Sequence, residues 1–246
     1  MRRTLFALAL MSVAIATQAS APSISIGSLH DQLPSDTSRM LKRVRNVGDA
    51  TAYVRVEVSR LVLDAQGKSR EEPVDNATLA RSDSVANGII ASPSRLIIPA
   101  NGGQQATTLV HRGERDQERY YRIRFVPVLP STEEFSLTDA QQSDYAKSIS
   151  ASVSVFAGYG SILIVPPSQS RFATRLEGNV IHNDGNATIV LENLRLCEAE
   201  GSGACSAGIK VHVRPGQLYA VQRAATHKAY FQVVEGPQRR ELVLSD

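Results

Sequence analysis

Short runs of alternating polar and apolar residues recur along almost the whole chain after residue 21, and Gly, Pro, Asn and Asp turns separate them. Examples are "TAYVRVEVSRLVL", "RYYRIRFVPV" and "KAYFQVVE". A period of two places alternate side chains on opposite faces of a strand, whereas an amphipathic helix needs a period of 3.6. Many short strands at this spacing predict an all-β sandwich or barrel, and no stretch has a convincing helical period.

The Pro166-Pro167 pair divides these strand-like runs into two groups of similar size. Proline has no N–H to donate to a sheet ladder, so the pair cannot lie inside a central strand. We therefore expect two domains, over residues 22–166 and 167–246. Hydrophobic residues make up 42% of the chain and charged residues 21%, which is enough apolar material for two cores.

The first 21 residues have the order of a secretory signal peptide: Arg2 and Arg3, the apolar run "LFALALMSVAIA", and the small-residue stretch "TQASA". The apolar run is shorter than the ~20 residues that a membrane-spanning helix needs. We expect cleavage after Ala21 or after Ala19, and an exported protein that is not embedded in a membrane.

The two cysteines, Cys197 and Cys205, are separated by "EAEGSGA", a connector rich in small residues between two strand-like runs. In an oxidising compartment this spacing predicts a local disulfide, worth about 2–3 kcal/mol in the chain-entropy model. The Asp184-Gly185 pair predicts a hairpin turn in the same half of the chain.

Sequence motifs of enzymes and of metal sites are missing from the chain. We expect no catalytic activity, no cofactor and no metal, and a net charge of only +3 gives no reason to expect nucleic acid as a partner. The histidines are far apart in sequence and lack metal-ligand spacing: His30, His111, His182, His212 and His227.

Two basic runs, "RMLKRVRN" and "RYYRIRF", allow two interpretations. The cations of each run, Lys42 included, are expected to share one sheet face. They either form a solvated surface paired with glutamates such as Glu57, Glu71 and Glu72, or one of them faces a cleft. An arginine in a cleft suits a carboxylate ligand, because its planar guanidinium binds both oxygens.

The segment "SISASVSVFAGYGSILIVPP" over residues 148–167 has the strictest alternation in the chain. Its serines fall on one side, and a polar stretch over residues 129–147, expected to be a functional or disordered loop, precedes it. The other side carries small and apolar residues: Ile149, Ala151, Val153, Val155 and Ala157.

The order of these motifs resembles the PapD-type periplasmic chaperones that assemble pili. "IIASPSRLIIPANGGQQATTLV", "ERYYRIRFVPVLP", a polar loop and an alternating strand resemble their first domain. "IHNDGNATIVLENLRLCEAEGSGACSAGIKVHVRPGQ" resembles the second domain of the branch that assembles class 5 fimbriae. The resemblance implies two immunoglobulin-like β-sandwiches in a boomerang, located in the periplasm.

The resemblance also implies a function. A chaperone of this kind lends a strand to pilus subunits, both pilins and the tip adhesin, and delivers them to an outer-membrane usher. The lent strand would lie near residues 148–165 and would present the five apolar residues named above. The alternative is a secreted immunoglobulin-like adhesin or a structural subunit of a pilus.

The family anchors the terminal carboxylate of the subunit with two cations. Here the matching position of the first strand falls at His30 or Gln32, and the matching position of the donor strand falls near Ser161. The candidates for the anchor are therefore Arg122, Arg124, His30 and the hydroxyl of Tyr159.

Overall fold

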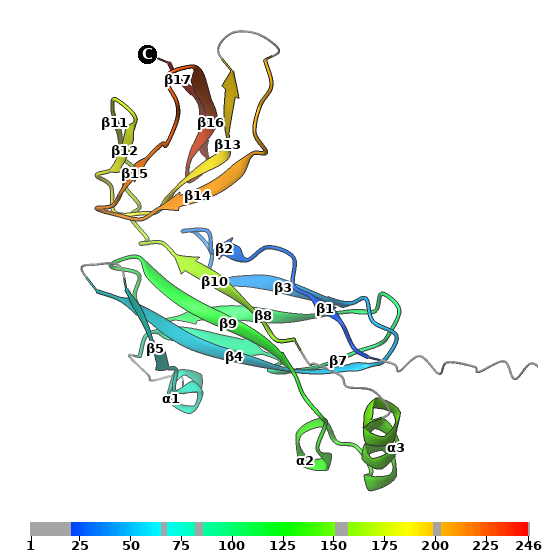
Figure 1. The fold of residues 1–246 in the computed structure, drawn as a ribbon. Helices are drawn as coiled ribbons and strands as arrows, with labels where there is room; N and C mark the ends of the chain where they lie inside the picture. Colours follow the sequence, from blue (N-terminus) through cyan, green and yellow to red (C-terminus); the bar gives the residue numbers. More distant parts are fainter. Residues whose placement is uncertain (1–20, 65–67, 82–85, 151–156, 199–202, 246) are drawn as a thin grey trace, which may run out of the picture.

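The computed structural model describes residues 21–64, 68–81, 86–150, 157–198 and 203–245. Strands dominate, and Figure 1 shows a second β unit standing at an angle on one end of the first, so the predicted pair of β-sandwiches in an L is confirmed. The signal peptide and its cleavage site lie outside the described residues.

The first sandwich is built from two sheets whose alternating residues meet in one core. One sheet has the strand order β1-β3-β8-β6 and the other β2-β10-β9-β4-β5, with β7 paired to β4. Tyr121, Ile123 and Phe125 of β9 are buried, while the arginines between them face outward. The strands are β1 (Ile24–Ser25), β2 (His30–Gln32), β3 (Arg39–Asn46), β4 (Ala52–Leu63), β5 (Ser69–Pro73), β6 (Gly88–Ser92), β7 (Arg95–Ile98), β8 (Gln104–Arg112), β9 (Arg119–Pro127) and β10 (Tyr159–Val165).

The second sandwich packs a three-stranded sheet, β11-β12-β15, against a four-stranded sheet, β14-β13-β16-β17. Its core contains Phe231, Ile189 and Leu191 and is separate from the first core. The two cores lie on either side of Pro166-Pro167, and the predicted domain ranges remain a prediction. The strands are β11 (Thr174–Glu177), β12 (Val180–Asn183), β13 (Ile189–Glu198), β14 (Ile209–Val213), β15 (Leu218–Ala220), β16 (His227–Glu235) and β17 (Gln238–Leu244).

The predicted disulfide between Cys197 and Cys205 is confirmed. The predicted hairpin at Asp184-Gly185 is wrong, because the turn joins β12 and β13, which belong to different sheets. Lys42 is also not part of an exposed basic face. Its side chain is buried between the sheets, where Nζ lies 2.6 Å from Asp31 Oδ2 and donates to the carbonyl of Ser28. This ion pair holds β2 against β3.

The same corner turn, N-x-G-x-A-T, occurs once in each sandwich, over residues 46–51 and 183–188. In each copy the asparagine is fully buried. The Asn46 amide donates to the carbonyls of Ala50 and Ile98, and the Asn183 amide donates to those of Ala187 and Val213. Each side-chain oxygen accepts from the glycine two residues later, so the asparagine fixes the turn from inside.

The polar stretch before β10 contains two helices, α2 (Thr132–Phe135) and α3 (Asp139–Ser150), so the expected loop is wrong. Ser131 caps α2 by accepting from the Glu134 amide. Thr138 and Gln141 bond to each other's backbone amides in a capping box at the start of α3. A third helix, α1 (Asn76–Ala80), precedes β6.

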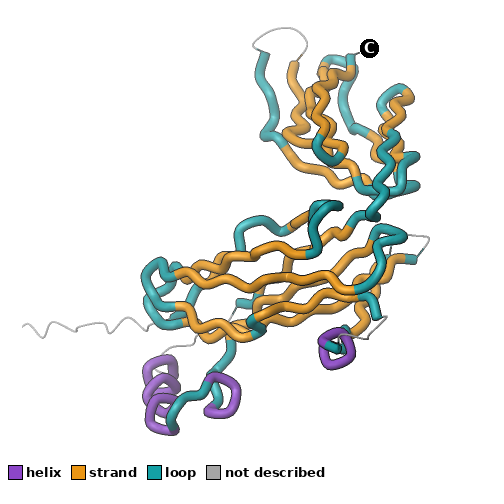
Figure 2. Tube along the Cα trace, turned by 180° about the vertical axis from the view of Figure 1, so that it is seen from behind, coloured by secondary structure: helices purple, strands orange, loops and turns teal. Residues whose placement is uncertain are grey.

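Helices α2 and α3 are attached to the end of the first sandwich that is remote from the second, as Figure 2 shows. The Tyr53 ring contacts the rings of Phe135 and Tyr145 edge to face, with centroids 5.2 and 4.8 Å away. The Tyr145 hydroxyl donates to the Thr51 carbonyl at 2.6 Å. Ile149 at the end of α3 is buried, with 4% of its surface exposed.

Candidate functional site: an open strand edge beside an interdomain cleft

Strand β10 is paired on both sides along only part of its length. It pairs antiparallel with β9 from Tyr159 to Val165, and parallel with β2 only from Ile162 to Ile164. Within the described part of the chain no strand covers the β2 side of β10 at Tyr159–Ser161. An edge with unpaired N–H and C=O groups accepts a further strand.

The predicted donor residues fall into three groups. Ile149 lies in α3, so its prediction as a strand residue is wrong for this structure: the capping box starts a helix and burial of Ile149 favours its last turn. Ala157 is exposed just before β10. Ala151, Val153 and Val155 lie outside the described residues, and their role as donor residues remains a prediction.

The outward arginines of β9 share one carboxylate. Arg124 makes two hydrogen bonds with Glu71, at 2.5 and 2.7 Å, and these hold the pKa of Glu71 below its usual value. Arg122 Nε lies 3.4 Å from the same carboxylate. The side chain of Arg122 crosses Gly160 of β10, where a Cβ would lie 3.2 Å from its Cδ. Glycine at this position therefore lets Arg122 lie flat against β10.

A cavity of about 240 Å³ opens beside Arg122, between the two domains. Four of its lining residues are basic or imidazole side chains and none is Asp or Glu. The rings of His30 and His212 stack across the domain boundary with centroids 4.3 Å apart. Burial lowers the pKa of both, that of His212 to about 4, so both are neutral near pH 7. The lining comprises His30, Leu61, Leu63, Ser69, Tyr120, Arg122, Ile162, Ile164, His212 and Arg214.

Two of the four predicted anchor residues, Arg122 and His30, meet in this cavity. Arg124 and Tyr159 do not line it, and Tyr159 lies at the far end of β10 with 39% of its surface exposed. Ser161 faces the core and is fully buried, so this position cannot present a side chain to the cleft.

His212 and Arg214 of the second domain are not among the predicted anchor residues, all of which belong to the first domain. They lie two residues apart at the end of β14, so the alternation of "IKVHVRPG" places them on one side of the strand. The sequence contains that alternation, but it does not show which domain the side chains face.

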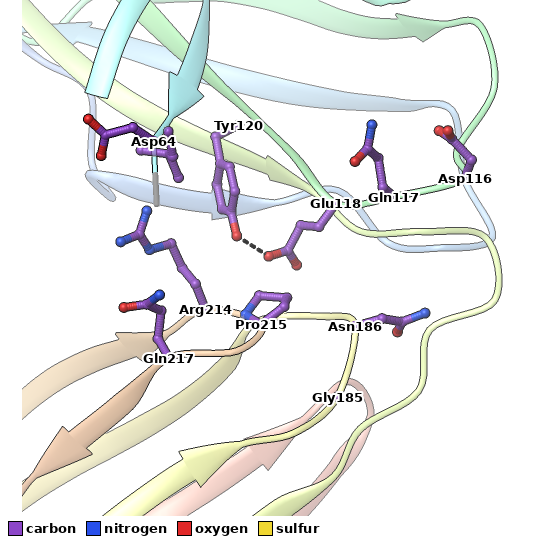
Figure 3. A pocket seen from close by; sticks show the side chains of 11 residues that line it. Asp64, Asp116, Gln117, Glu118, Tyr120, Gly185, Asn186, Arg214, Pro215 and Gln217 are labelled. Atoms are coloured by element: carbon purple, nitrogen blue, oxygen red, sulfur yellow. Dashed lines mark hydrogen bonds between the residues drawn. The ribbon is translucent and has the colours of Figure 1, made fainter. Parts of the chain in front are cut away.

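A second cavity, of about 400 Å³, adjoins the first and shares Leu63, Tyr120 and Arg214 with it. Figure 3 shows Glu118 and Tyr120 of the first domain lying opposite Arg214 and Pro215 of the second. The Glu118 carboxylate accepts from the Thr188 amide at 2.7 Å, from the Thr188 hydroxyl at 2.5 Å and from the Tyr120 hydroxyl. Burial raises the pKa of Glu118 above its usual value.

Arg115 makes another contact with the connection between the domains. Its guanidinium donates to the carbonyl of Pro166 at 2.9 Å, and also to several carbonyls that follow β2, among them Pro34 at 3.0 Å and Thr37 at 2.7 Å. All of these hydrogen-bond acceptors are neutral carbonyls, and burial lowers the pKa of Arg115. Arg115 thereby bonds the connection between the domains to the loop after β2.

The described residues include no group of three or more His, Cys, Asp or Glu side chains able to hold a metal ion. Among the helices in the described ranges, none combines the length and the apolar character that crossing a membrane requires.

The chain is similar in sequence and in fold to known proteins. No family model matches the chain. The protein named "Probable fimbrial chaperone EcpB" of Escherichia coli O157:H7 (strain EC4115 / EHEC) is 26% identical over 190 residues, which cover 77% of this chain and 75% of that one. The chain is related to fimbrial chaperones.

Solved structures of fimbrial chaperones share the fold. The class 5 fimbriae chaperone CfaA matches 91% of this chain and all of its own, with a TM-score of 0.53 and 18% identity. A chain from a chaperone–tip adhesin complex of CFA/I fimbriae matches 90% of this chain and 98% of its own, with a TM-score of 0.50 and 16% identity. Both matches extend over the two sandwiches.

Proposed function

We propose that the chain is a periplasmic chaperone of a chaperone/usher pilus system. It binds pilus subunits, stabilises them by lending a strand, and delivers them to an outer-membrane usher. The observation that carries the proposal is the open edge of β10 beside a cavity lined by cations, in a chain related to fimbrial chaperones. A structural subunit with one incomplete sandwich would not align over both sandwiches of CfaA.

Strand lending suits this edge for a physical reason. A subunit that lacks one strand exposes an apolar groove and unpaired backbone groups, which would otherwise aggregate. The β10 edge supplies the backbone partners, and the alternating residues before it, Val153 and Val155 foremost, supply side chains for the groove. We propose that binding acts through these contacts and needs neither a cofactor nor a catalytic step.

The cleft suits the end of the subunit. A terminal carboxylate that leaves water needs a cation with several donors, and Arg122 supplies one at the cavity wall. Arg124 is held by Glu71 and lies outside the cavity, which makes it a matched control.

The test of strand lending is the double variant Val153→Asp, Val155→Asp. Two charges in an apolar groove cost several kcal/mol, about 2 or more for each residue. We expect the variant to remain soluble, to melt within a few degrees of the wild type, and to lose its co-purifying subunit. A variant that folds and still protects subunits from periplasmic proteolysis would contradict the proposal.

A further inference from the structure

We propose that the carboxylate site is shared by both domains: Arg214 of the second domain binds the subunit's terminal carboxylate together with Arg122 of the first. The Glu118–Thr188 contact positions Arg214 for this task. The inference rests on the proposed function and assigns its binding site to residues that only the folded pair of domains brings together.

The charges around the cavity favour Arg214 as a ligand-binding cation. Arg122 shares Glu71 with Arg124, so part of its charge is already compensated. Arg214 forms no ion pair within the described part of the chain. The adjoining cavity contributes the carboxylates of Asp64 and Glu118, and Figure 3 shows Arg214 extending toward the first domain between Asp64 and Tyr120. The Glu118 carboxylate already accepts three hydrogen bonds from other groups.

The shape of the cavity fits the end of a chain better than a larger ligand. A volume of about 240 Å³ is below the usual range of about 300–1,000 Å³ for drug-sized ligands. Apolar residues, including Leu61, Ile162 and Ile164, form much of its wall beside the two arginines. Such a site accepts an anionic group attached to an apolar segment, and excluding water strengthens the arginine–carboxylate bonds.

The position of Arg214 depends on the contact between the domains. Thr188 begins the segment that leads into β13, and β14 pairs with β13, so the Glu118–Thr188 bonds fix the sheet that carries Arg214. The stacked rings of His30 and His212 hold the same boundary from the cavity side. Glu118 and Thr188 are therefore positioning residues for the carboxylate site.

The test measures preference for a free carboxylate and uses the full-length mature protein. The probe is a fluorescent peptide with the sequence of the C-terminal strand of the co-purifying subunit, made once as the free acid and once as the amide. We expect wild type to bind the acid about tenfold or more tightly than the amide. Arg214→Gln should bring the two affinities to within about threefold while leaving binding of the amide unchanged.

The matched control is Arg175→Gln, an exposed arginine of the second domain that is paired with Asp184 and Glu177. It should retain the full preference for the acid. If Arg214→Gln retains the preference while Arg122→Gln removes it, the site belongs to the first domain alone and the shared site is overturned, whereas the chaperone proposal stands. A wild type that does not distinguish acid from amide also overturns the shared site.

The positioning role is tested by Thr188→Val, which removes the hydroxyl donor and keeps the backbone amide and the side-chain shape. We expect the preference for the acid to fall several-fold, with a change in the radius of gyration by X-ray scattering. The control for general destabilisation is a conservative substitution, Tyr230→Phe, in β16. Full preference in a variant whose interdomain angle has changed would refute the positioning role.

Discussion

The two N-x-G-x-A-T turns have the same internal hydrogen bonds, but they hold different parts of the molecule. In each sandwich a buried asparagine bonds the turn from inside, and the threonine at the end of the motif meets a partner from elsewhere in the chain. The Thr51 carbonyl accepts the Tyr145 hydroxyl of α3. The Thr188 amide and hydroxyl donate to Glu118 of the other domain. The same corner thus holds a helix in one sandwich and a whole domain in the other.

The turn is the same rigid support in both sandwiches. Residues from elsewhere in the chain determine which part of the molecule it holds. The Tyr145 hydroxyl of α3 needs one acceptor, and the Thr51 carbonyl supplies it. A buried carboxylate needs several donors, and Thr188 gives it two while Tyr120 gives a third. The turn in the second domain is therefore part of the contact between the domains, which we call the hinge. The turn in the first domain is an attachment point at the remote end.

The largest effect is expected when the buried asparagine of each turn is replaced. We expect Asn46→Ala and Asn183→Ala each to lower the free energy of unfolding by about 3–5 kcal/mol, because each removes a fully buried amide that donates to two carbonyls. Urea denaturation followed by circular dichroism measures both, with exposed Gln105→Ala as the control. Losses that differ by more than about 2 kcal/mol would show that the two turns are not equivalent.

Each of the two turns contains a glycine that lies close to neighbouring backbone. A Cβ on Gly48 would lie 2.3 Å from the Ala21 carbonyl, and one on Gly185 would lie 2.4 Å from the Arg171 carbonyl. Both contacts are with backbone, so we expect Gly→Ala to cost about 1–3 kcal/mol at each site. Only Gly185→Ala should also alter the scattering profile, since Arg171 belongs to the connection between the domains. Equal profiles would argue against the hinge role of this turn.

A smaller effect is expected where α3 is attached to the first sandwich. Tyr145→Phe removes the bond to the Thr51 carbonyl and keeps the ring against Tyr53, so the loss should be about 1 kcal/mol. Hydrogen exchange should accelerate over residues 139–150 and stay unchanged in the second domain. Faster exchange at the hinge would mean that the two attachments are coupled.

The smallest effect is in the pH dependence. Burial raises the folded-state pKa of Glu118, so the folded protein holds this proton more tightly than the unfolded chain. The contribution of Glu118 to stability therefore increases as pH falls through the raised pKa toward the usual value of 4.5. Glu118→Gln removes this dependence, and the difference between the two proteins in urea denaturation at several pH values measures it. Tyr145 stays protonated over the same range and gives a flat comparison.

Alternation predicted the strands because burial in this molecule follows sheet faces. Tyr121, Ile123 and Phe125 alternate with outward arginines as the sequence indicates. Lys42 was misplaced because its partner, Asp31, comes from the opposite sheet, and a pattern within one strand contains no information about that sheet. Ile149 was misplaced because its alternating neighbours outweighed the capping box at Thr138 and Gln141, which the sequence does contain.

The site could be predicted only in its first-domain half. Arg122 and His30 followed from strand position and from family resemblance. Arg214 did not, because its approach to the cleft depends on the angle between two separate cores, which is set by the bonds of Glu118 and Arg115. The repeated turn was visible in the sequence as two copies of one motif, and only the structure shows its two uses.

Helix α3 keeps part of the connection between β9 and β10 in a compact form. Its twelve residues span about 18 Å as a helix and would span about 40 Å as a strand. About 20 Å of chain length is therefore kept coiled within the connection between β9 and β10, where the rings of Tyr53 and Tyr145 hold the helix. If α3 unwound, the connection between β9 and β10 would lengthen by this amount while both strands kept their register.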